Sequence, residues 1–261
     1  MTKIAIMYDF DQTLCTRNMQ EYPLLGELGI DAPDFWKNVQ EEATSHNMDP
    51  ILAYMYMLVT QARRHGRFLT RSMFERQGRD IEYFPGVEEY FSRMNAYAQS
   101  LDVQLQHYII SSGTKEIIDG TSIASEFTRI YACEFHYDEN GNADWPAIAI
   151  NYTGKTQFLF RIQKNSLDVY DNSRINLYHT EREIPFTHMI YIADGYTDVP
   201  CMRLVKGYGG CSIAVHTEND TTCRQLVADQ RVNYTALADW REGSELDLII
   251  KKVISEMAAK E

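Results

Sequence analysis

The stretch IAIMYDFDQTL, residues 4–14, joins five apolar residues to two carboxylates, Asp9 and Asp11, which stand two positions apart. A short apolar run of this kind is typical of a buried strand in a parallel sheet, and open α/β sheets bind ligands beyond the carboxyl ends of their strands. Two like charges at such a place cost free energy unless a cation or a proton relieves them. The stretch indicates a divalent metal site, acid/base chemistry or both, and it is also compatible with an ordinary acidic loop. Other segments of the chain are needed to choose between these interpretations.

The composition is that of an ordinary globular protein: 261 residues, of which 44% are hydrophobic and 24% are charged. This length allows one large domain, or a main domain that carries an insertion. No stretch approaches the roughly 20 apolar residues that cross a bilayer, and the first residues do not read as a secretory signal with a cleavage site. We therefore expect no membrane partner and a cytoplasmic location.

The formal net charge of −12 disfavours nucleic acid as a partner, because phosphate polymers bind to positively charged surfaces. The five cysteines show no C-x-x-C spacing, so neither a zinc site nor a disulfide framework is indicated. A small anion in a locally positive pocket remains compatible with this composition. The sequence does not indicate an oligomeric state.

Short apolar runs alternate with helical patterns along the chain, which predicts an α/β fold with a Rossmann-like parallel sheet and flanking helices. The runs cover residues 4–8, 108–110, 189–193 and 212–215. In the last helical pattern, apolar residues recur at helical spacing from Leu246 to Met257, and Ser244 is the expected N-cap.

The first two strands are separated by far more residues than one crossover helix requires. Helical patterns fill this segment until Pro85-Gly86 ends it. We predict a helical cap at residues 16–84, inserted after the first strand into an α/β core made of residues 1–15 and 85–261. A second excursion, residues 132–151, contains the turn signal Asn140-Gly141 and is expected to form a hairpin at the sheet edge.

Two further segments bring hydroxyl groups and an amine to the ends of these elements. Ser111, Ser112 and Gly113 follow the second strand, where hydroxyls and backbone N–H groups can hold an anion. The same residues also suit an ordinary helix N-cap. Lys155 stands near a helix N-terminus, a place that the helix dipole disfavours for a cation unless an anion faces it.

Acidic residues return directly after the strand at residues 189–193, as Asp194 and Asp198. With these, the chain resembles the haloacid dehalogenase (HAD) superfamily of phosphohydrolases. Four motifs in order carry the resemblance: Asp9-x-Asp11-x-Thr13, Ser111, Lys155, and Asp194-x-x-x-Asp198. The long helical insertion is similar to the type 1 cap of the phosphoserine phosphatase-like branch.

The resemblance implies a role for each motif. Asp9 is the expected nucleophile, which forms an aspartyl-phosphate. Asp11 is the expected acid that protonates the leaving oxygen and then the base that activates water. Mg²⁺ is the expected cofactor, and its expected ligands are Asp9, Asp11 through its backbone carbonyl, Asp194, and Asp198 unless this last residue orients Lys155. The substrate phosphate is expected to bind to Ser111, Ser112, Gly113 and Lys155.

Some positions depart from the pattern of this branch. Gln12 stands where glycine or serine is frequent, and Ser112 stands where a second glycine is frequent. The acidic cap residue with which phosphoserine phosphatases read the substrate amine has no certain match, although Glu21 lies nearby. The substrate is therefore left open.

The expected function is that of a HAD-type phosphoric monoester hydrolase, a Mg²⁺-dependent phosphatase that acts on a small phosphorylated metabolite. Phosphoryl transfer, by a phosphotransferase or a phosphomutase on the same fold, is an alternative. Dehalogenation is disfavoured, because a dehalogenase would not need Asp11 and Asp194. A protein that binds a phosphate ligand without turnover is a third possibility, although both the nucleophile and the acid are present.

Overall fold

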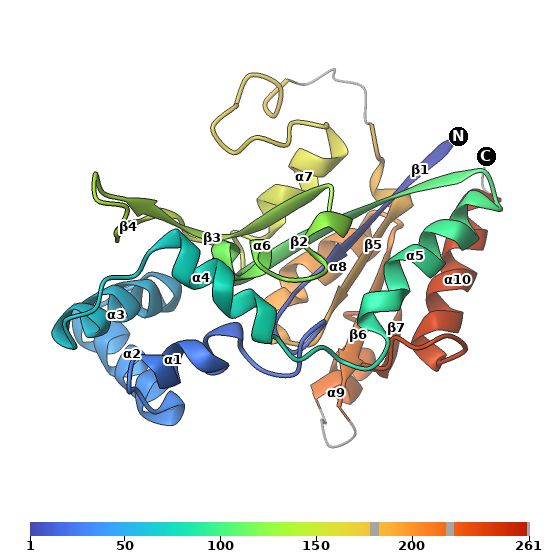
Figure 1. Ribbon diagram of the computed structural model, residues 1–261. Helices are drawn as coiled ribbons and strands as arrows, with labels where there is room; N and C mark the ends of the chain where they lie inside the picture. The colour runs from blue at the N-terminus through green and yellow to red at the C-terminus, as the bar shows by residue number, and fades with distance from the viewer. Residues whose placement is uncertain (178–182, 218–221, 260–261) are drawn as a thin grey trace.

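The computed structural model describes residues 1–177, 183–217 and 222–259, and within them seven strands form one sheet (Figure 1). The strands lie in the order β4-β3-β2-β1-β5-β6-β7, and each neighbouring pair is parallel except β3 with β4. Their bounds are β1 Thr2–Tyr8, β2 Val103–Thr114, β3 Arg129–Tyr137, β4 Ala143–Ile148, β5 Met189–Ala193, β6 Cys211–His216 and β7 Tyr234–Leu237. The predicted α/β fold with a parallel sheet is confirmed, and β7 is a strand that the apolar runs did not indicate.

Helices cover both faces of the sheet, which explains the unbroken apolar runs of the central strands. On one face, α5 (Val87–Gln99) and α10 (Glu245–Ala258) pack together. On the other face lie α7 (Thr156–Gln163) and α8 (Val199–Gly207), and α9 (Thr222–Ala228) packs against β6 and β7. All five residues of β5 are buried, as expected for a strand covered on both sides.

The helices predicted between the first two strands are present. They are α1 (Pro23–Glu27), α2 (Ala32–His46), α3 (Pro50–Arg64) and α4 (Arg71–Gln77). The N-terminus of α3 is capped by Asp49, whose Oδ1 accepts a 2.8 Å hydrogen bond from the Ile51 N–H. The apolar face expected of this helix is buried, and the division into a core and a cap at residues 16–84 stays a prediction.

The last helix of this segment, α4, packs closely on α6 (Lys115–Asp119), the short helix that follows β2. A Cβ on Gly120 would lie 1.8 Å from the backbone oxygen of Glu75, so only glycine allows this spacing.

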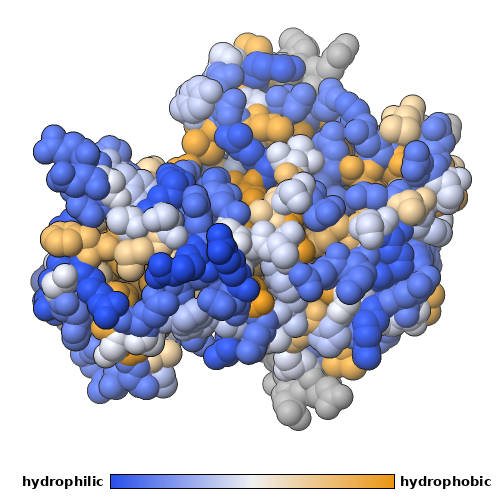
Figure 2. Space-filling model, in the orientation of Figure 1, coloured by the Kyte–Doolittle hydropathy of each residue, from blue (hydrophilic) through white to orange (hydrophobic). Residues whose placement is uncertain are grey.

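The β3–β4 hairpin confirms the ribbon predicted at the sheet edge, with Gly141 at a φ of 76° in its turn. It reaches over the inserted helices, because the Ala143 N–H donates a 2.7 Å hydrogen bond to the Leu69 carbonyl. The face of the molecule in Figure 2 is mainly hydrophilic, with apolar side chains in small groups. In the part of the chain that is described, no helix is both long and apolar enough to span a bilayer.

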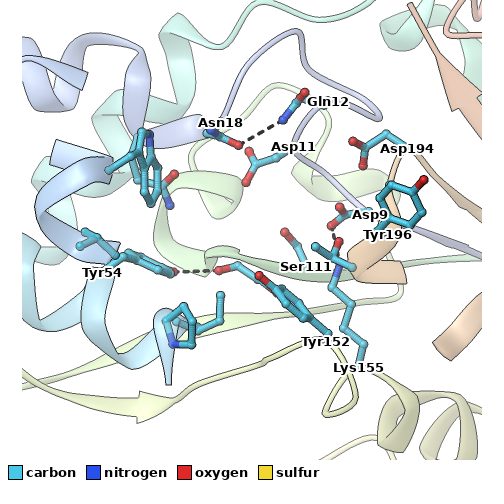
Figure 3. A pocket seen from close by; sticks show the side chains of 18 of the residues that line it. Asp9, Asp11, Gln12, Asn18, Tyr54, Ser111, Tyr152, Lys155, Asp194 and Tyr196 are labelled. Atoms are coloured by element: carbon cyan, nitrogen blue, oxygen red, sulfur yellow. Dashed lines mark hydrogen bonds and ion pairs between the residues drawn. The ribbon is translucent and has the colours of Figure 1, made fainter. Parts of the chain in front are cut away.

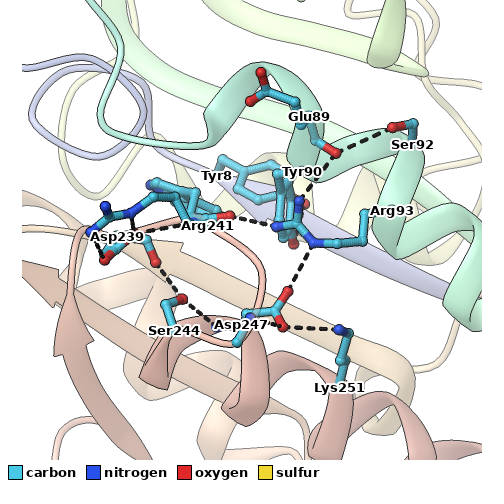
Figure 4. Close-up of polar contacts among 12 residues, drawn as sticks. Tyr8, Glu89, Tyr90, Ser92, Arg93, Asp239, Arg241, Ser244, Asp247 and Lys251 are labelled. Atoms are coloured by element: carbon cyan, nitrogen blue, oxygen red, sulfur yellow. Dashed lines mark hydrogen bonds and ion pairs between the residues drawn. The ribbon is translucent and has the colours of Figure 1, made fainter.

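The predicted C-terminal helix is present as α10, and Ser244 is its N-cap, since its Oγ accepts a 3.1 Å hydrogen bond from the Asp247 N–H. Asp247 also ties α10 to α5 (Figure 4). Its buried carboxylate lies 3.1 Å from Arg93 Nε and 2.9 Å from Lys251 Nζ. This ion-pair network fixes the two helices against each other on one face of the sheet.

Candidate active site

A cavity of about 540 Å³ opens at the carboxyl ends of β1, β2 and β5 and is closed from the other side by α2 and α3 (Figure 3). The carboxyl ends of parallel strands meet at one edge of the sheet, so residues far apart in the sequence come together here. The predicted site residues that line the cavity are Asp9, Asp11, Ser111, Ser112, Lys155 and Asp194. Gly113 and Asp198 do not line it, but contact the side chains of Ser111 and Lys155.

Asp9 is held where β1 ends. Its N–H donates a 3.0 Å hydrogen bond to the Ile192 carbonyl of β5, and the chain then turns sharply because the Phe10 carbonyl accepts from the N–H groups of residues 13–15. Gln12, inside this turn, has a φ of 55° in the left-handed region. Such a conformation costs a residue other than glycine roughly 1 kcal/mol. The turn is tight enough to bring Asp9 and Asp11 into one cavity.

Lys155 precedes the first residue of α7 and reaches back to the end of β1. Its Nζ lies 3.1 Å from Asp9 Oδ1 and 2.7 Å from Asp198 Oδ1. Burial alone lowers the pKa of Lys155, but the carboxylates of Asp198 and Asp9 outweigh burial and hold the pKa above its ordinary value. The lysine therefore carries a positive charge at the bottom of the cavity, as an anion-binding role requires.

Three carboxylates gather beside this lysine. Asp9, Asp194 and Asp198 each offer an oxygen atom, and these atoms all lie within 4.8 Å of one another. Burial, followed by repulsion from Asp198, raises the pKa of Asp9, and burial, followed by repulsion from Asp9 and Asp198, raises that of Asp194. Two buried carboxylates and a half-buried one that repel one another are a donor set that fits a hard divalent cation.

The side chain of Asp11 stands apart from these three carboxylates. Its Oδ1 accepts a 2.8 Å hydrogen bond from the Met19 N–H, in the segment between β1 and α1. Burial and the charge of Asp9 raise the pKa of Asp11 to about 8. A carboxyl group that keeps its proton near neutral pH is suited to act as a general acid.

Ser111 and Ser112, near the end of β2, also line the cavity. Ser111 Oγ accepts a 3.0 Å hydrogen bond from the Gly113 N–H, which leaves the Ser111 hydroxyl hydrogen available for a ligand. The Ser112 Oγ is buried and has no hydrogen-bond partner among the described residues, although Ser112 lines the cavity. A Cβ on Gly113 would lie 2.1 Å from Met19 Cε, so a larger residue there would require the Met19 side chain to move. The helix expected at these residues begins only at Lys115, after the strand ends.

Asp198 has two protein partners that the sequence did not indicate. Its Oδ1 accepts a 2.6 Å hydrogen bond from the Tyr191 hydroxyl, and its Oδ2 accepts a 2.8 Å hydrogen bond from Thr197 Oγ1. Tyr191 lies on β5, and its place in an apolar run indicates only a buried strand residue. Aromatic residues of the cavity wall, such as Trp36 and Tyr152, were also missed, because nothing in the local sequence marks which face they share.

The chain is 29% identical, over 96% of its own length and 96% of the other, to an uncharacterized protein of Borreliella burgdorferi (strain ATCC 35210 / DSM 4680 / CIP 102532 / B31). No protein-family model matches the chain.

Solved structures similar to this one have low sequence identity. A HAD family hydrolase from Salmonella enterica subsp. enterica serovar Typhi aligns with 95% of this chain and 70% of its own, at a TM-score of 0.64 and 13% identity. A substrate-bound phosphoserine phosphatase aligns with 97% of this chain and 99% of its own, at a TM-score of 0.61 and 15% identity. A phospho-aspartyl intermediate analogue of phosphoserine phosphatase has a TM-score of 0.60, with 16% identity and coverage of 97% and 99%.

The chain therefore has the fold of the HAD hydrolases. Within that class, its overall architecture is that of the phosphoserine phosphatases, matched over nearly their whole length. The resemblance in fold that the four motifs suggested is confirmed.

Proposed function

We propose that this protein is a Mg²⁺-dependent phosphatase that hydrolyses a small phosphorylated metabolite through an aspartyl-phosphate on Asp9, and that it acts in the cytoplasm. The observation that carries the proposal is the contact of Asp9 with Lys155, 3.1 Å apart, in a cavity at the carboxyl ends of the strands, with the carboxylates of Asp194 and Asp198 close by. The similarity to HAD hydrolases and phosphoserine phosphatases supports the same reaction class.

In the proposed first step, a carboxylate oxygen of Asp9 attacks phosphorus and the bond from phosphorus to the leaving oxygen breaks. Asp11 donates its proton to that oxygen, so the product leaves as an alcohol. In the second step, Asp11 takes a proton from water as the water oxygen attacks the phosphorus of the aspartyl-phosphate. The bond between phosphorus and the Asp9 oxygen breaks, so inorganic phosphate leaves and the Asp9 carboxylate is restored.

A carboxylate that approaches a phosphate dianion is repelled, so positive charge is needed. Lys155 supplies one charge at the attacked group, and the Ser111 hydroxyl can donate a hydrogen bond to a phosphoryl oxygen. Bound Mg²⁺ would supply the further positive charge that lowers this repulsion. Asp9, Asp194 and the Asp11 backbone carbonyl would hold it.

Asp198 is proposed to position Lys155. Its oxygen atoms accept hydrogen bonds from Lys155, Tyr191 and Thr197, so its hydrogen-bonding capacity is largely used by the protein. Its negative charge still adds to the attraction for a cation at the group of three carboxylates.

A phosphate-release assay over a panel of phosphorylated metabolites with Mg²⁺ tests this function. We expect turnover by the wild type and a loss of roughly a thousandfold or more in Asp9→Asn, with a phosphoryl group trapped on Asp9 in the wild type and detected by mass spectrometry. Asp229→Asn, at an exposed ion pair with Arg231, is the matched control and should retain full activity. Undiminished turnover in Asp9→Asn would exclude the proposal, and addition of an acceptor alcohol would reveal a phosphotransferase by its product.

A further inference from the structure

The cavity continues from the carboxylates to a wall built mainly of ring and aliphatic side chains. Trp36 and Val39 come from α2, and Ile51 and Tyr54 come from α3. The rings of Trp36 and Tyr54 pack edge to face, with centroids 6.1 Å apart. Figure 3 shows Tyr54 at the far end of the cavity from Asp9 and Lys155, with Tyr152 between them in this view. A substrate whose phosphate lay at the carboxylates and Lys155 would extend toward this wall.

The charges of the cavity lie at its other end. Among the described residues that line it, Lys155 is the only cation, and both Asp9 and Asp198 already pair with it. The carboxylates that line the cavity are those of Asp9, Asp11 and Asp194. Most polar side chains that the inserted segment adds to the lining are amides, such as those of Gln20 and Gln40. A charged leaving group would contact this apolar surface without gaining an ion pair there, so an uncharged group fits it better.

Charged residues of the inserted segment make other contacts. The Glu21 carboxylate accepts hydrogen bonds of 2.6 Å from both Trp36 Nε1 and Asn18 Nδ2, and Glu21 does not line the cavity. This carboxylate thus holds the tryptophan of the wall in place. Arg63 donates to the Ala143 carbonyl of the hairpin, and Arg71 lies 3.4 Å from Glu134 of β3. These arginines are engaged by the hairpin.

Resting on the proposed function, we infer that the substrate is the phosphomonoester of an uncharged alcohol that carries a ring. The ring packs against the aromatic wall of Trp36, Tyr54 and Tyr152, and the amides near it bond to hydrogen-bonding groups on the ring's edge. The cavity of about 540 Å³ is within the range of small-molecule sites. This chemistry differs from that of an amino acid phosphate, whose leaving group carries both an ammonium and a carboxylate.

A matched series of esters tests the inference on the purified chain with Mg²⁺. Benzyl phosphate, 4-carboxybenzyl phosphate and 4-(aminomethyl)benzyl phosphate share one type of leaving oxygen and differ mainly in charge. We expect kcat/KM for benzyl phosphate to exceed that for each charged ester by about tenfold or more. Acetyl phosphate, which is too small to reach the wall, is the reference substrate for the chemistry.

The outcomes separate the inference from the function on which it rests. The inference is overturned, and the phosphatase function stands, if acetyl phosphate is hydrolysed but the charged esters are turned over as fast as benzyl phosphate. The same holds if acetyl phosphate is hydrolysed and none of the three esters is turned over. No phosphate release from any of the four compounds overturns the proposed function, and the inference falls with it.

A charge introduced at the wall provides a second test. Gln40 on α2 is exposed and lines the cavity, so Gln40→Lys should place a cation near the leaving group without disturbing the core. We expect the ratio of kcat/KM for 4-carboxybenzyl phosphate over benzyl phosphate to rise about fivefold or more. Asn38→Lys, on the same helix but outside the cavity lining, is the control and should leave this ratio unchanged. Equal ratios in both variants would contradict the inference.

Discussion

Asp198 does not line the cavity, yet its Oδ1 accepts a 2.7 Å hydrogen bond from the Lys155 ammonium, which does. The aspartate is fully buried and the lysine is 1% exposed, so the pair is shielded from water. Breaking a buried ion pair leaves an uncompensated charge and is strongly unfavourable. Lys155 is thereby held toward Asp9 at the position that the proposed reaction requires.

Asp198→Asn should lower phosphatase activity by about 10- to 100-fold, as is typical when the partner of a site residue is removed. The inhibition constant of inorganic phosphate should rise as well, because Lys155 is less firmly held and less strongly charged. Tyr191→Phe removes one hydrogen bond to Asp198 but leaves its charge, so the loss should be only severalfold. Equal losses in the two variants would indicate that packing, rather than charge, is what matters here.

Removal of divalent metal with EDTA should abolish activity, and Mg²⁺ should restore it and raise the melting temperature. At a Mg²⁺ concentration of 100 times Kd, the stabilisation is expected to be about 2.7 kcal/mol. Asp194→Asn should lose most of this rise. Without metal, the variant should be at least as stable as the wild type, because it removes repulsion among the three carboxylates. Thermal unfolding with and without Mg²⁺ measures both effects, and a full Mg²⁺ response in Asp194→Asn would argue against this metal site.

The buried His107 should make stability fall in acid. Burial lowers the pKa of His107 to about 3, and its ring nitrogens lie 2.9 Å from the Tyr8 hydroxyl and 3.0 Å from Asn95 Oδ1. In the unfolded chain the ring gains a proton below about pH 6.5, whereas in the folded chain it stays neutral down to about pH 3. Each pH unit in that window should cost up to about 1.4 kcal/mol.

His107→Gln carries no titrating group, so its stability should decline less between pH 6.5 and pH 5 than that of the wild type. Urea unfolding at several pH values measures the difference. The contributions of the carboxylates to the pH dependence cancel, because both proteins contain the same carboxylates. Parallel pH profiles for the two proteins would show that His107 does not carry this dependence.

The ion-pair network of Figure 4 predicts that two of its aspartates contribute very differently to the free energy of unfolding. Asp247→Ala should destabilise the fold by about 2–4 kcal/mol, because it leaves Arg93 and Lys251 without their shared buried carboxylate. Asp239→Ala is the matched control: its partner Arg241 is 67% exposed, so the change should cost about 0–1 kcal/mol. Similar unfolding free energies for the two variants would contradict the structural role of Asp247.

The sequence by itself was enough for the class of fold and for the edge of the sheet at which the acidic residues meet. A buried parallel strand shows as an unbroken apolar run, and the acidic residues directly after two such runs had to meet at one edge of the sheet. The hairpin at Asn140-Gly141 and the cap of α10 by Ser244 were also predictable, because turns and caps depend on residues a few positions apart. The short strand β7 was missed, since its four residues form no distinctive run.

Only the tertiary structure decided how the side chains of the site are paired. The sequence left open whether Asp198 binds metal or orients Lys155, and the contact with Lys155 joins residues 43 positions apart. Likewise, the hydrogen bond from Trp36 to Glu21 and the close packing of Trp36 on Tyr54 create the apolar wall. Periodicity reports which side of an element is buried, but the partner of each buried polar group depends on how distant elements pack, and no local pattern contains that information.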